Sequence, residues 1–138
     1  MIEHKIAHGL STIYKKEAGH GDSLPSSHAA GIMEFLVSTP AVLTMIIDAS
    51  SNLLDPLLPT GYVTVGKKIE LTHEKPTLTG ETITLILTVT KVEGDNIFLE
   101  VAAHDALGLI CKGIYERTIV NKDKLIETAY GRSKHTLL

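Results

Sequence analysis

The chain has a single cysteine, Cys111, among its 138 residues. An intramolecular disulfide needs two cysteines and a thiolate zinc site needs several, so both are excluded. A lone cysteine suits a reducing compartment. The N-terminal residues also lack the continuous apolar core of a signal peptide. Together these features predict a cytoplasmic protein.

Long hydrophobic runs are absent as well. The longest nearly apolar stretch, residues 40–47, is far shorter than the roughly 20 residues of a transmembrane helix, so no membrane association is predicted. Lys and Arg number 13 against 16 Asp and Glu, and the positive charges are scattered along the chain. Nucleic-acid binding needs many phosphate contacts on one surface, so no nucleic-acid partner is predicted.

What the chain does contain is an ordinary globular composition. Hydrophobic residues make up 43% and charged residues 21%. A chain of this length predicts one domain with a sizeable core. A first strand is expected over residues 6–14, followed by a turn-rich loop over residues 18–31.

One long helix is predicted over about residues 39–57. Ser38 or Thr39 suits the N-cap position, and proline is tolerated in the first turn that follows. The segment is apolar on nearly every side, which is typical of a buried helix. Asp55-Pro56 and the Pro-Thr-Gly sequence at 59–61 end it.

The hydrophobic period changes to two after Gly61. Four strands are expected, over residues 62–73, 81–93, 97–106 and 109–120, with short turns between them. An apolar helix followed by a meander of long strands predicts an α+β fold, in which an antiparallel sheet covers the helix.

Three segments resemble the fluoroacetyl-CoA thioesterase-like branch of the hot-dog fold thioesterases. They are STPAVLTMIIDA at 38–49, VGKKIELTHEKPTLTGETIT at 65–84 and VAAHDALGLICKGIYERTIV at 101–120. The first has the Thr-Pro-Ala helix start of that family. The second has a glycine followed seven residues later by the histidine of a Thr-His pair. The resemblance covers roughly residues 30–125.

The resemblance implies a hot-dog fold, with an antiparallel sheet wrapped around one long buried helix. The domain is expected over residues 1–130, with residues 131–138 as a frayed tail. Such folds commonly continue one sheet edge into a second subunit, so a homodimer or higher homo-oligomer is expected. The implied substrate is an acyl-CoA or another acyl thioester, and no cofactor or metal is predicted.

The family site, carried over by motif, assigns Thr39 and His73 to catalysis and Gly66 to backbone contact with the acyl group. The family glutamate does not carry over, because Ile47 stands eight residues after Thr39. Asp48 is the adjacent carboxylate. At about 100° per residue it lies roughly 180° around the helix from Thr39, so it would reach the site through a one-residue bulge or a helix that starts one residue later.

Each site residue also has a purely structural interpretation. Thr39 would be explained as an N-cap, although a helix N-terminus also suits a thioester carbonyl. His73 would be a strand-end histidine, or a general acid–base. Ser38 is a substrate-binding alternative to Thr39. Arg117 is a candidate for binding a phosphate of coenzyme A, or a member of an ion pair with Glu116.

Two functions remain open at this point. The first is an acyl-CoA thioesterase that hydrolyses a small or medium acyl thioester. The second is a non-catalytic acyl-CoA binding or sensing protein, which keeps the pocket but lacks the family glutamate. An apolar acyl pocket is expected, and its candidate lining residues are Leu36, Val37, Val42, Met45 and Ile46.

Overall fold

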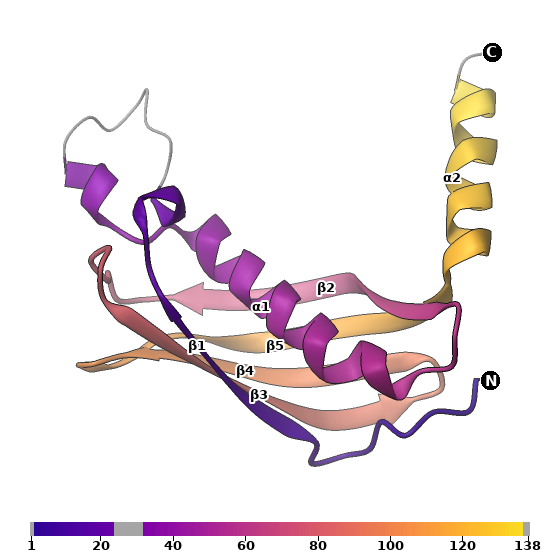
Figure 1. Ribbon diagram of the computed structural model, residues 1–138, viewed down its shortest axis with the longest axis horizontal. Coiled ribbons are helices and arrows are strands. Elements are labelled where there is room, and N and C mark those ends of the chain that lie inside the picture. The colour runs from indigo at the N-terminus through magenta and orange to yellow at the C-terminus, as the bar shows by residue number, and fades with distance from the viewer. Residues whose placement is uncertain (1, 24–31, 137–138) are drawn as a thin grey trace.

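The computed structural model describes residues 2–23 and 32–136 (Figure 1). Five antiparallel strands form one sheet in the order β1-β3-β4-β5-β2. Their bounds are β1 Ser11–Glu17, β2 Tyr62–His73, β3 Thr82–Glu93, β4 Asn96–Asp105 and β5 Gly108–Asn121. Helix α1, Thr39–Leu54, lies across one face of this sheet. The predicted α+β arrangement of an antiparallel sheet around one long helix is confirmed.

The core lies between α1 and the inner face of the sheet. Alternate residues of β3 and β4 point inward because successive side chains of a strand face opposite sides. On the helix, the buried residues recur at the spacing of one face. The inward residues are Val42, Met45, Ile46, Ala49 and Leu54 from α1, with Ile83, Leu85, Leu87, Val89, Ile97, Leu99, Val101 and Ala103 from the sheet.

The predicted helix of residues 39–57 is α1 extended by a short 3-10 helix, Asp55–Leu57. Its burial differs from the prediction. Only one face is buried, and Ile47 on the other face is 44% exposed. The apolar character of that second face is therefore not explained by the core of one chain.

Two boundaries differ from the prediction. The first strand is Ser11–Glu17, where β1 pairs with β3, rather than residues 6–14. Residues 131–136 of the predicted frayed tail belong instead to helix α2, Lys122–Thr136, which projects away from the sheet (Figure 1), and residues 137–138 lie outside the described residues. The Asn121 side chain accepts a 3.0 Å hydrogen bond from the Lys124 N–H at the start of α2.

No helix in the described part of the chain is long and apolar enough to cross a membrane.

Strands β1 and β2 are the two edges of the sheet. β2 is 12 residues long and pairs on one side only, with β5. Its final residue is His73, and α1 begins at Thr39. The fold thus brings together two residues that are far apart in sequence.

Candidate functional site

Thr39 and His73 meet where the N-terminus of α1 lies beside the end of β2. Thr39 Oγ1 and His73 Nδ1 are 2.8 Å apart, within hydrogen-bonding distance. Thr39 is exposed and His73 is half-buried, so a ligand can reach both. This is the distance at which a base can accept a proton from a hydroxyl nucleophile.

Ser38, not Thr39, caps the helix. Ser38 has extended backbone angles, and its Oγ accepts a 3.1 Å hydrogen bond from the Ala41 N–H. Capping therefore accounts for Ser38 and leaves the Thr39 hydroxyl available for His73. The structural interpretation of Thr39 as an N-cap is wrong.

Replacing Ser38 with alanine is expected to lower the free energy of unfolding by about 1 kcal/mol, because an N–H in the first turn of α1 loses its acceptor. Ser38→Asp should restore most of this loss, since aspartate is an equally good cap. Urea denaturation measures both. Loss of acyl thioester binding at unchanged stability in Ser38→Ala would instead assign Ser38 to the substrate.

The Thr39–His73 pair lines an open cavity of about 250 Å³. Leu36 and Val37 supply part of an apolar wall, as predicted for an acyl pocket. The other three candidate lining residues, Val42, Met45 and Ile46, are buried on the core side of α1 and do not line it. They point inward because they lie on the opposite helical face from the exposed Ile47.

Cys111 lies directly across from His73 in the β2–β5 pairing. It is buried, and burial raises the pKa of its thiol to about 11. The thiol is therefore protonated at neutral pH, as expected of a small core residue rather than a nucleophile. The described residues contain no group of three or more His, Cys, Asp or Glu side chains placed to bind a metal ion.

A second cavity, of about 240 Å³, lies farther along the junction of α1 and β2. Leu43, Ile47, Gly66, Ile69 and Tyr115 line it, together with Lys67 and Lys68. Ile47 and Gly66 are the two positions at which the family pattern places the glutamate and the glycine. Gly66 begins a β-bulge, where the register with β5 shifts.

The two cavities are well separated within one chain. Eight residues of helix place Thr39 about 12 Å from Ile47 along the α1 axis, at about 1.5 Å per residue. Seven residues of strand place Gly66 about 23 Å from His73, at about 3.3 Å per residue. One chain therefore brings Thr39 to His73, and Ile47 to Gly66, but does not bring these two pairs together.

Asp48 does not take the place of the missing glutamate in the described geometry. Helix α1 runs without interruption from Thr39 to Leu54, so there is no bulge to rotate Asp48 toward Thr39. Asp48 is exposed and lines neither cavity. Ile47, by contrast, lies on the same side of the helix as Thr39 and Leu43, at intervals of four residues.

Arg117 is 2% exposed, which does not suit a residue that binds a phosphate group in solvent. Its guanidinium donates to Thr64, Tyr115 and Ser51 inside the molecule. Nor does it pair with Glu116, whose side chain lies on the opposite face of the sheet, 3.5 Å from Lys67 Nζ. The alternation of side chains along β5 could have predicted that Arg117 is buried, because Tyr115 and Ile119 point to the same inward face.

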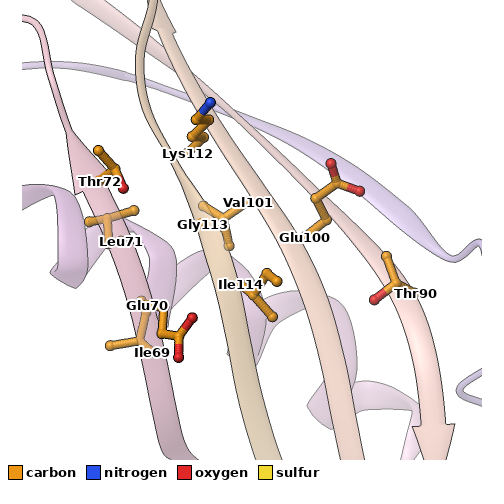
Figure 2. A pocket seen from close by; sticks show the side chains of 10 residues that line it. All are labelled: Ile69, Glu70, Leu71, Thr72, Thr90, Glu100, Val101, Lys112, Gly113 and Ile114. Carbon is orange, nitrogen blue, oxygen red and sulfur yellow. The ribbon is translucent and has the colours of Figure 1, made fainter.

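A larger hollow, of about 710 Å³, lies on the sheet, and neither Thr39 nor His73 lines it (Figure 2). It is lined by residues of β2, β3, β4 and β5. Glu70, Glu100 and Lys112 are its charged residues. None of the residues that the sequence assigned to the site lines it.

Comparison with known proteins agrees with these observations. The family model for fluoroacetyl-CoA-specific thioesterase matches residues 23–123. The fluoroacetyl-CoA thioesterase of Streptantibioticus cattleyicolor is 30% identical over 100 residues, which are 72% of this chain and 66% of that protein. The match thus spans slightly less than two thirds of that relative.

Two solved structures show the same fold. A hot-dog-like protein from Thermanaerovibrio acidaminovorans has a TM-score of 0.84 and 30% identity, over 91% of each chain. The fluoroacetyl-CoA thioesterase FlK has a TM-score of 0.85 and 22% identity, over 92% of this chain and 97% of that one. With the family match over residues 23–123, these results confirm the resemblance found in the sequence: the chain belongs to the fluoroacetyl-CoA-specific thioesterase family of the hot-dog fold.

Proposed function

We propose that this protein is an acyl-CoA thioesterase that hydrolyses a small or medium acyl thioester. The observation that carries this proposal is the 2.8 Å contact between Thr39 Oγ1 and His73 Nδ1. The thioesterase family to which the chain belongs supports the reaction class. The apolar linings of both cavities support an acyl group as the part of the substrate that is recognised.

In the proposed reaction, Thr39 Oγ1 attacks the thioester carbonyl carbon while its proton passes to His73. The carbon–sulfur bond then breaks, and His73 returns the proton to the leaving coenzyme A thiolate. Water then attacks the acyl carbon while its proton passes to His73. The bond from that carbon to Thr39 Oγ1 breaks, His73 returns the proton to Oγ1, and the acyl group leaves as a carboxylic acid. Within the first turn of α1, Pro40 has no N–H and the N–H groups of Ala41 and Val42 donate to Ser38, so the oxyanion needs another donor.

We propose further that two copies of the chain complete the site. The unpaired edge of β2 and the exposed apolar Ile47 support this, since unpaired edges and apolar faces favour association. In an antiparallel pairing of two β2 strands centred on Ile69, Gly66 lies opposite Thr72 of the second copy. Gly66 and Ile47 then meet Thr39 and His73 of the other chain.

Charge supports this register. Lys68 and Glu70 flank Ile69 on the outer face, where their side chains are 3.3 Å apart and largely exposed. In the pairing centred on Ile69, each lysine lies opposite the glutamate of the second copy, a favourable cross-strand arrangement. If the pairing were centred on Lys68 or Glu70 instead, that residue would lie opposite its own copy, and like charges would face each other.

We also propose a cytoplasmic location, as predicted from the single cysteine.

The proposal is tested by incubating the full chain with a panel of acyl-CoA esters of increasing acyl length and detecting the released thiol. We expect turnover of at least one small or medium acyl-CoA, and a dimeric mass by light scattering. Release no faster than the uncatalysed background for every ester would refute the thioesterase.

The alternative is an acyl-CoA binding protein without turnover. Ile47 in the second cavity favours it, because an apolar side chain there offers neither a base nor a hydrogen bond. Calorimetric titration with the same panel separates the two functions. Binding of an acyl-CoA that is never hydrolysed would select the binding protein.

A further inference from the structure

Arg117 is a buried cation held in place by four hydrogen bonds. Its Nε donates to Thr64 Oγ1 at 2.9 Å, and its Nη1 donates to the Tyr115 hydroxyl at 2.8 Å. Its Nη2 donates to Ser51 Oγ at 2.9 Å and to the Thr64 carbonyl at 2.7 Å. No carboxylate forms a salt bridge with it within residues 2–23 and 32–136. Hydroxyl and carbonyl oxygens, and no carboxylate among the described residues, therefore surround its positive charge.

This arrangement fixes the role of the Tyr115 hydroxyl. Arginine has donors only, so the Tyr115 oxygen must be the acceptor, and its own proton is directed elsewhere. None of the hydrogen bonds found among the described residues uses that proton. A hydroxyl that accepts from a cation is a stronger donor than a free one.

The Tyr115 side chain lies at the second cavity. Tyr115 is 4% exposed and lines that cavity together with Gly66. A Cβ atom on Gly66 would lie 2.6 Å from the Tyr115 hydroxyl oxygen, so the glycine leaves room for the hydroxyl. Leu43, Ile47 and Ile69 surround it with apolar side chains. A ligand with a hydrogen-bond acceptor is the chemistry that this cavity fits.

We propose that Tyr115 donates a hydrogen bond to the carbonyl oxygen of the acyl thioester, and that Arg117 is its positioning residue. The inference rests on the proposed function. In the pairing of two copies, Gly66 and Tyr115 of one chain meet the thioester held by Thr39 and His73 of the other. The phenolic proton stays on Tyr115 throughout, and its hydrogen bond strengthens as the carbonyl oxygen gains negative charge.

The proposal also accounts for Ile47. A glutamate at that position would line the same cavity as Tyr115 and would accept the phenolic proton. An isoleucine cannot accept it, so the donor stays free for the substrate. Position 47 and Tyr115 thus act together in setting the polarity of this cavity.

Tyr115→Phe tests the catalytic role, because it removes the hydroxyl and keeps the ring. We expect kcat on the best acyl-CoA of the panel to fall about 100-fold, the size typical of a lost oxyanion donor, while KM changes less than about threefold. Ile83→Val is the matched control, since it mildly destabilises the core on β3 and leaves the cavity intact. A kcat equal to that of Ile83→Val would refute the role of Tyr115.

A mixed dimer separates a contribution across the interface from a structural effect within one chain. One chain carries His73→Ala and the other carries Tyr115→Phe, with different affinity tags for purification. If Tyr115 acts on the site of the other chain, one of the two sites is intact, and about half of the wild-type activity is expected. Activity near that of Tyr115→Phe alone would overturn the proposal. A wild-type chain that hydrolyses no ester refutes the proposed function itself, so the two failures are distinguishable.

Discussion

Replacing His73 with alanine is expected to lower kcat/KM for acyl-CoA hydrolysis about a thousandfold, within the range of a lost general acid–base. The imidazole is the group within 2.8 Å of the Thr39 hydroxyl, so its removal leaves the nucleophile without a base. The loss should appear mainly in kcat, because the apolar walls that hold the acyl group are unchanged. Thiol release at several substrate concentrations measures both constants.

His8→Ala is the matched control for this variant. His8 is exposed on the segment before β1 and lines neither cavity at the α1–β2 junction. We expect it to leave activity within about twofold of wild type, as for most surface substitutions. Light scattering and thermal melting establish that both variants remain folded and dimeric. Unchanged hydrolysis by a folded, dimeric His73→Ala protein would contradict the assigned role.

The sequence suggested Thr39 and His73 as a pair, but it could not fix the distance between them. Both residues follow from motifs, and they are 34 positions apart in the chain. Their meeting depends on where α1 crosses the end of β2, which no local pattern specifies. The choice between Ser38 and Thr39 as the cap was equally open, because both residue types cap helices well. Only the backbone geometry of the helix start distinguishes them.

Arg117 and Tyr115 were misjudged or missed for a different reason. Charged residues are almost never fully buried unless they are paired, so an arginine in a strand is first assigned to the surface. Here the cation is satisfied by hydroxyl and carbonyl oxygens contributed by α1, β2 and β5. These partners are up to 66 positions away in the chain. The sequence of β5 showed which of its residues point inward, but it did not show the hydrogen-bond partners of Arg117.

Helix α2 was missed because its sequence gives little helical signal. Its residues are mostly polar and contain a glycine, and those whose side chains are described are all exposed. Most helical stability in proteins comes from packing an amphipathic face, and α2 packs little surface within one chain. The predicted bounds of the first strand were also wrong. Pairing with β3 sets the bounds of β1, and the alternation of its own residues does not.

The largest effect on stability is expected from Gly113→Ala. At this point of β5, a Cβ atom would collide with the Glu70 carbonyl oxygen and lie 3.0 Å from Leu71 Cα. Both atoms belong to the backbone of β2, so no side-chain rotation can relieve the contact. Either β2 moves away, which breaks hydrogen bonds of the β2–β5 ladder, or β5 bends into the core. We expect a loss of about 3 kcal/mol in the free energy of unfolding, the upper part of the range for overpacking.

Urea denaturation measures this loss, and Gly131→Ala provides the matched control. Gly131 lies in α2, and a Cβ atom there has nothing within 4 Å. Alanine is favoured over glycine inside a helix, so this variant should be as stable as wild type or more stable by up to about 1 kcal/mol. Because His73 lies two residues beyond Leu71 on the same strand, Gly113→Ala should also separate His73 from Thr39 and lower hydrolysis. Wild-type stability in Gly113→Ala would contradict the close approach of β5 to β2 on which the position of His73 depends.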